Sequence, residues 1–100
     1  MIRHIVMFRL KEFSDPSEKQ KAAKILKNEL LSMMTKIPVI QEFEIGINFN
    51  SNSFAFDVVI NSAFANHEDL EIYQHHPAHQ AFIAFNKNYS AEKVIVDYEL

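Results

Sequence analysis

The chain contains no cysteine, no tryptophan and a single glycine among its 100 residues. Without cysteine it can form no disulfide framework, no thiolate nucleophile and no cysteine-ligated zinc site. This composition suits the reducing cytoplasm, where we expect the protein to act. A long apolar run is also missing. The early stretch 2–10 carries charged residues, and no later run approaches the roughly 18 apolar residues of a membrane-spanning helix. We therefore expect no membrane segment.

An excess of positive charge is absent as well. Lys and Arg number 10 against 13 Asp and Glu, which gives a formal net charge of −3 and disfavours a nucleic-acid partner. What the chain does have is 48% hydrophobic residues, enough for one core, and we expect one domain over residues 1–100. A domain of this size buries a modest fraction of its surface, so pairing into a homodimer would stabilise it.

Period-two alternation predicts four strands, at residues 2–11, 43–47, 54–62 and 93–98. In the first strand both faces carry large apolar groups, since Ile5 and Met7 alternate with His4, Val6 and Phe8. A face exposed to water would rarely hold Ile5 and Met7, so a partner should cover it. Gly46, in the second strand, indicates a bulge or a close approach between backbones.

Capping signals predict the helices. Asp15 followed by Pro16 and Glu18 is typical of a helix start, and Pro38 should end this long helix near residues 36–37. Asn66 should cap a second, shorter helix. Pro77 interrupts that helix, and a further helical piece should fade near residues 86–88.

The order β-α-β-β-α-β predicts an α+β, ferredoxin-like fold with a four-stranded antiparallel sheet and helices on one face. The other face would be furnished by Ile5, Met7, Ile95 and one register of the central hairpin. Two copies could bury these faces against each other as a barrel-like core, so we expect a dimeric α/β barrel.

Several fragments, spread over nearly the whole chain, resemble the Dabb family of stress-responsive dimeric α/β-barrel proteins. They are the strand start 2–10, the Ile37-Pro38 break, the 43–46 strand, the segment 73–79 and the ending 96–98. The pattern Tyr-x-x-His-Pro-x-His at 73–79 is the most diagnostic. The resemblance implies the same dimeric barrel that the alternation predicts.

Within this family the chain is distantly similar to a plant polyketide cyclase, which implies that Tyr73 and His79 are catalytic and that His4 lines the pocket. His79 would remove an acidic proton between two carbonyls while the Tyr73 phenol donates to the enolate. Positions that hold pocket aromatics in the cyclase fall near Leu26 and Leu30 here, so we do not expect the same substrate. The full set of expected ligand contacts is His4, Val6, Phe8, Leu26, Leu30, Val59 and Phe82.

No metal site is predicted, because Pro77 disturbs the helical spacing of His75, His76 and His79. We expect no cofactor. The resemblance leaves open a cation held by backbone carbonyls around Ile37, which side chains cannot predict.

Our leading hypothesis is a homodimeric Dabb domain that binds a small apolar or aromatic carbonyl compound between sheet and helices. One alternative is a cofactor-free cyclase, lyase, isomerase or monooxygenase that uses His79 and Tyr73. Another is a non-enzymatic, stress-linked structural protein in which Tyr73 packs and His79 bonds the backbone. A filled space around Tyr73 would favour the structural role, and a cavity that reaches Tyr73 and His79 would favour binding or catalysis.

Overall fold

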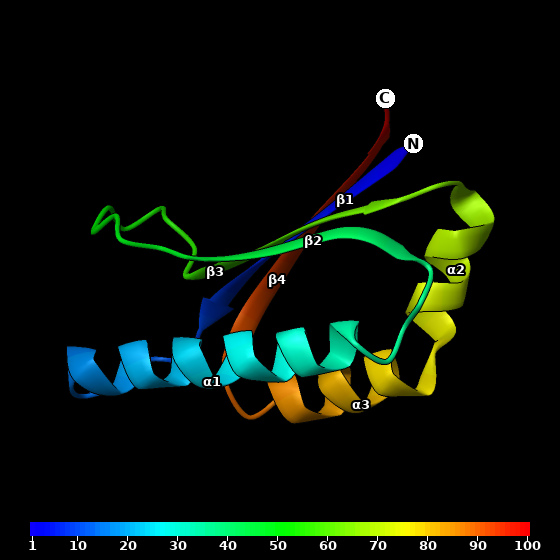
Figure 1. Ribbon diagram of the computed structural model, residues 1–100. Coiled ribbons are helices and arrows are strands. Elements are labelled where there is room, and N and C mark those ends of the chain that lie inside the picture. Colours follow the sequence, from blue (N-terminus) through cyan, green and yellow to red (C-terminus); the bar gives the residue numbers. More distant parts are fainter.

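Three helices cover one face of a four-stranded antiparallel sheet (Figure 1). The computed structural model describes residues 1–100. The strands are β1 (Ile2–Leu10), β2 (Ile40–Ile47), β3 (Val58–Phe64) and β4 (Ser90–Glu99), and the helices are α1 (Pro16–Met34), α2 (His67–His75) and α3 (Pro77–Asn86). The spatial strand order is β2-β3-β1-β4. The predicted ferredoxin-like α+β fold is confirmed.

Side-chain caps start each helix where the sequence predicts. The carboxylate of Asp15 accepts from the Ser17 amide at 2.9 Å, and the amide oxygen of Asn66 accepts from the Asp69 amide at 2.8 Å. The break at Pro77 is confirmed too, and the ring of His76 caps α3 by accepting from the Ala78 amide. The α1 helix ends at Met34, slightly before the predicted end.

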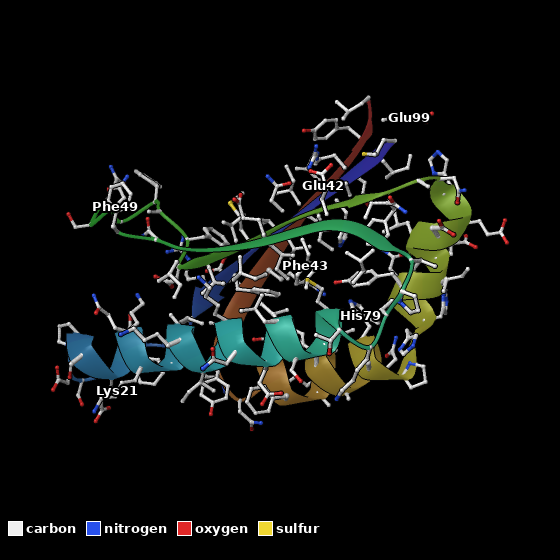
Figure 2. All side chains as sticks on the ribbon, viewed as in Figure 1. Lys21, Glu42, Phe43, Phe49, His79 and Glu99 are labelled. Carbon is white, nitrogen blue, oxygen red and sulfur yellow. The ribbon has the colours of Figure 1, made fainter.

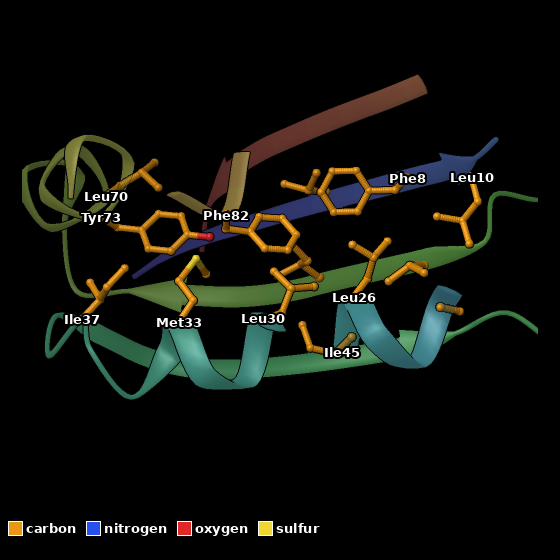
Figure 3. Packing of buried hydrophobic residues seen from close by; sticks show 14 of the residues in the cluster. Phe8, Leu10, Leu26, Leu30, Met33, Ile37, Ile45, Leu70, Tyr73 and Phe82 are labelled. Atoms are coloured by element: carbon orange, nitrogen blue, oxygen red, sulfur yellow. The ribbon is translucent and has the colours of Figure 1, made fainter. Parts of the chain in front are cut away.

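The core lies between α1 and the helix-facing side of the sheet. Leu26, Leu30 and Met33, one helical turn apart, point toward the sheet in Figure 3, where Ile45 and Phe8 meet them. Leu26 and Leu30 are completely buried. None of the three helices is long and apolar enough to span a membrane.

The predicted start of the third strand at Phe54 is wrong. Residues 48–57 form a loop, and β3 begins at Val58. The side chains of Asn48, Asn50 and Asn52 each accept from a backbone amide two residues ahead, and such local bonds compete with strand pairing. The alternation of Phe54 and Phe56 therefore did not indicate a strand.

Gly46 marks neither a bulge nor a close approach between backbones, but the close approach of a side chain on the neighbouring strand. A Cβ at this position would lie 2.9 Å from Cγ1 of Val59 on the neighbouring strand, closer than carbon atoms can approach. The irregularity in the pairing of β2 with β3 falls instead between Ile40 and Glu42.

The sheet face away from the helices, which we call the open face, carries exposed apolar side chains. They come from Met7 on β1, 37% exposed, and from Val94, Val96 and Tyr98 on the edge strand β4. The prediction that Ile95 belongs to this face is wrong. Ile95 pairs with Val6, and directly opposed residues share a face, so Ile95 lies on the helix side.

Changing Leu30 to Ala should lower the free energy of unfolding by about 2–5 kcal/mol, because it leaves a cavity in the fully packed layer between α1 and the sheet. Leu31→Ala is the matched control. Its side chain is 37% exposed, and the loss should stay within about 0.5 kcal/mol. Urea unfolding of both variants measures the difference, and equal losses would contradict this account of the core.

Candidate functional site

A cavity of about 420 Å³ lies on the helix side of the sheet, between β1, β4 and the α2–α3 pair. Much of its wall is apolar. Val6, Phe8 and Ile60 project from the sheet, and Phe82 and Ile83 face them from α3. The rings of Phe8 and Phe82 lie 6.2 Å apart, centre to centre. This is the composition of a small-molecule pocket, provided that a few polar groups converge on it.

Three polar side chains on separate elements do converge there: His4 from β1, Tyr73 from α2 and His79 from α3. The turn at Pro77 folds α3 back beside α2, which brings the rings of Tyr73 and His79 to 4.5 Å. The His4 ring lies 5.9 Å from Tyr73 in an edge-on arrangement. Figure 2 shows His79 near the corner where α2 and α3 meet.

Asp97 orients the ring of His4. The two residues are directly opposed in the pairing of β1 with β4, and Nδ1 of His4 is hydrogen-bonded to the Asp97 carboxylate. His4 is 3% exposed, so its ring nitrogens need hydrogen-bond partners, and Asp97 supplies one. With Nδ1 engaged, the free nitrogen of His4 is Nε2, and His4 lines the cavity.

His79 is held as a neutral base. Its Nδ1 lies 3.0 Å from the carbonyl oxygen of Gln74, which can only accept, so Nδ1 carries a proton, and in the neutral ring Nε2 keeps its lone pair. Burial lowers the pKa of His79 below its usual value. The bond to Gln74 opposes that shift, and the charges of His4 and Lys93 add to it.

Tyr73 is a neutral hydrogen-bond donor. Its side chain is 1% exposed, and burial raises the pKa of the phenol far above its usual value. The hydroxyl has no hydrogen-bond partner within the chain. Every side-chain oxygen or nitrogen that is sealed from solvent does have a partner, so the hydroxyl is not sealed from solvent. The hydroxyl must therefore open onto the cavity that Tyr73 lines. Figure 3 shows it pointing toward Phe82.

Together these groups present a donor at Tyr73 and an acceptor at His79, side by side in an apolar chamber. A carbonyl oxygen could accept from the phenol, while Nε2 of His79 could accept from a hydroxyl or take an acidic proton beside that carbonyl. In a low-dielectric site such bonds are stronger than in water.

Most of the residues predicted for the site are brought together: His4, Val6, Phe8, Tyr73, His79 and Phe82 all line the cavity. Three other predicted ligand contacts do not line this cavity. Leu26 and Leu30 lie on the buried face of α1 in the core, and Val59 lies on the open face, because it is paired with Met7. A one-residue step along a strand moves a side chain to the other face.

Sequence reasoning missed Asp97, Ile95 and Lys93. The period-two pattern of β4 held a signal for all three, because residues at odd positions of this strand lie opposite even positions of β1 and share their face. Finding that signal requires the register of the strands, which alternation alone does not supply.

No group of three or more His, Asp or Glu side chains is placed to hold a metal ion. The histidines of the 73–79 segment each bond to a different backbone group. Nδ1 of His75 is bonded to the Glu71 carbonyl, and His76 caps α3.

Known proteins are similar to this chain in both sequence and fold. The family model of the stress responsive A/B barrel domain (Dabb) matches residues 2–100. An uncharacterised protein of Streptomyces coelicolor is 33% identical over 99 residues, which cover 99% of each chain. A dimeric protein of ferredoxin-like fold from Bacteroides fragilis is 29% identical, with a TM-score of 0.86 over 99% of this chain and 95% of its own. Hydroxynitrile lyase from Passiflora edulis, at 18% identity, shares the fold with a TM-score of 0.81 over 99% of this chain and 92% of its own.

The lowered pKa of His79 makes stability depend on pH. In the unfolded state the imidazole takes up a proton near its ordinary pKa of about 6.5, whereas in the folded state it does so only at lower pH. The contribution of His79 to the free energy of unfolding is therefore complete above about pH 6.5 and is lost as the pH falls through the lower pKa of the folded state. Urea unfolding at about pH 7.5 and about pH 5.5 should show a smaller decrease for His79→Gln than for wild type. His75→Gln, an exposed histidine of the same segment, is the matched control and should behave as wild type. Identical decreases in all three proteins would contradict the burial of His79.

Proposed function

The chain belongs to the stress responsive A/B barrel domain (Dabb) family, and we propose that it acts as a cytoplasmic homodimer that binds a small apolar or aromatic carbonyl compound in the cavity. One observation carries this proposal: the Tyr73 hydroxyl, almost wholly buried, has no partner within the chain and opens onto the cavity. The proposal invokes no metal and no cofactor.

A carbonyl oxygen is the group that best complements this site. A neutral phenol donates, and a ligand acceptor in the cavity would complete its hydrogen bonding, which contributes about 0.5–1.5 kcal/mol for a typical bond. The neighbouring lone pair of His79 favours a ligand whose carbonyl stands beside a hydroxyl, an enol or an acidic C–H group. The apolar wall formed by Phe8 and Phe82 accommodates a ring or an alkyl chain.

The cavity also bears on the alternative that Tyr73 and His79 only hold the fold together. A purely structural pair would be expected in a filled space, with its polar atoms satisfied by the chain. Here one cavity reaches both side chains, and the phenol has no partner. Both features favour a ligand site.

Catalysis is the second candidate, and the neutral state of His79 favours it. A histidine that keeps its lone pair at neutral pH can act as a general base, and the adjacent phenol can donate to the developing oxyanion. A cofactor-free lyase, cyclase or isomerase would use these two groups. The Passiflora protein, named a hydroxynitrile lyase, has the same fold.

The homodimer is supported by the open face. Met7, Val94, Val96 and Tyr98 present contiguous exposed apolar surface, which monomeric proteins usually avoid. The Bacteroides relative is described as dimeric. Pairing two open faces would cover these groups in an interface of ordinary size, about 1,600 Å² in total.

Benzoylacetone, an aromatic diketone, is a suitable probe for the cavity, with butylbenzene as a hydrocarbon of the same carbon count. NMR titration should show that wild type binds the diketone more tightly than the hydrocarbon, with the largest shifts at the amides of Tyr73 and Gln74. Tyr73→Phe keeps the ring but removes the donor, so affinity for the diketone should fall about three- to tenfold while affinity for butylbenzene is unchanged.

Tyr89→Phe is the matched control, because Tyr89 packs on Phe85 outside the cavity and should not affect either ligand. Binding that is equal for the two probes, or that is insensitive to Tyr73→Phe, would rule out the carbonyl site.

The dimer is tested by Met7→Glu, which places a charge at the centre of the open face and should yield monomer, or a mixture shifted to monomer, in sedimentation. Ile25→Glu is the control, since Ile25 has similar exposure, 41%, but lies on α1. It should leave the dimer intact. A Met7→Glu protein that stays fully dimeric would show that the open face is not the interface.

A further inference from the structure

The charged groups at the mouth of the cavity have a net positive sign. Lys87, Glu92 and Lys93 are the charged residues among those that line it. The carboxylate of Glu92 lies 3.1 Å from Nε of Arg9 and is thereby compensated, whereas neither lysine has an acidic partner within 4.0 Å. The chain as a whole carries a net charge of −3, so unpaired cations at this place are not a consequence of a generally basic surface.

Lys93 is the more informative of the two lysines. Lys87 directly follows α3, where a cation complements the helix C-terminus whether or not a ligand is present. Lys93 is not placed at a helix end. It stands on β4 directly opposite Phe8, so its side chain leaves the sheet on the same side as the apolar wall. Its charge also acts on His79, lowering the pKa of that imidazole after the larger effect of burial.

We propose that the ligand is an amphipathic keto acid whose carboxylate pairs with Lys93 at the mouth of the cavity. Its carbonyl accepts from Tyr73, and its apolar body lies against Phe8 and Phe82. This inference rests on the proposed carbonyl site and adds the charge of the ligand to it. An uncharged ketone would use the phenol and the apolar wall but would leave the cation at the mouth without a partner.

The expected gain is modest. An ion pair at an exposed rim is screened by solvent and salt, so the carboxylate should improve affinity about three- to fivefold at low ionic strength. The charge of Lys93 should also speed the association of an anionic ligand, because a cation at the mouth of a low-dielectric cleft attracts anions.

Lys93 has a competing structural explanation. β4 is an edge strand, and lysines on edge strands hinder unwanted pairing with other chains. That role would need no ligand and would be indifferent to the charge of a bound molecule, so the two explanations predict different binding behaviour.

Benzoylpropionate and its methyl ester form a matched pair of probes, since they share the ring and the ketone and differ in charge. In NMR titrations at low salt, wild type should bind the acid about three- to fivefold more tightly than the ester. Lys93→Gln should remove this preference by weakening the acid alone. Lys24→Gln, which removes an exposed lysine of α1 away from the cavity, should preserve it. Added salt should weaken only the acid.

The outcomes separate the two proposals. Equal binding of acid and ester to wild type overturns the keto-acid inference and leaves the carbonyl site standing. A preference for the acid that survives Lys93→Gln overturns the assignment of the carboxylate to Lys93 and also leaves the carbonyl site standing. Failure of both probes to bind overturns the carbonyl site and the keto-acid inference together.

Discussion

The register between β1 and β4 is the constraint on which the rest of this molecule depends. β1 is a central strand, and its pairing with β4 sets His4 against Asp97, Val6 against Ile95 and Phe8 against Lys93. All of these side chains lie on the helix side of the sheet. A slip of β1 by one residue would turn His4, Val6 and Phe8 onto the open face and bring Met7 to the cavity side. Apolar residues on both faces of β1 do not specify this choice, and the hydrogen bond between His4 and Asp97 adds a polar contact that this register satisfies.

The same arrangement explains the electrostatics of the cavity. Burial keeps Tyr73 protonated and His79 neutral, so the interior holds a donor and an acceptor without a net charge from either residue. The carboxylate of Asp97 is hydrogen-bonded to His4. Free positive charge is confined to the mouth, at Lys93 and Lys87. The proposed keto acid, apolar at one end and anionic at the other, complements an apolar chamber with neutral hydrogen-bonding groups inside and cations at the mouth.

Much of the fold could be predicted from local chemistry, because caps and alternation are local signals. Asp15, Asn66 and Pro77 begin the helices as expected. The motif resemblance located Tyr73 and His79, but it could not show that the phenol has no partner. Where prediction failed, longer-range geometry decided the outcome. Val59 and Ile95 were assigned to the wrong face because register is a property of two strands. Leu26 and Leu30 were expected at the pocket wall, but α1 covers a different part of the sheet from the cavity. Phe54 and Phe56 alternate as strand residues do, yet the asparagines before them favour a loop.

The most direct measurement of the central claim is the tautomer of His79, from long-range proton–nitrogen NMR of the imidazole side chains at neutral pH. We predict a neutral ring with the proton on Nδ1, bonded to the Gln74 carbonyl, and an unprotonated Nε2 whose nitrogen shift moves when a carbonyl ligand enters the cavity. A charged ring at neutral pH, or a proton on Nε2, would contradict it, because His79 would then lack the acceptor that stands beside the Tyr73 donor.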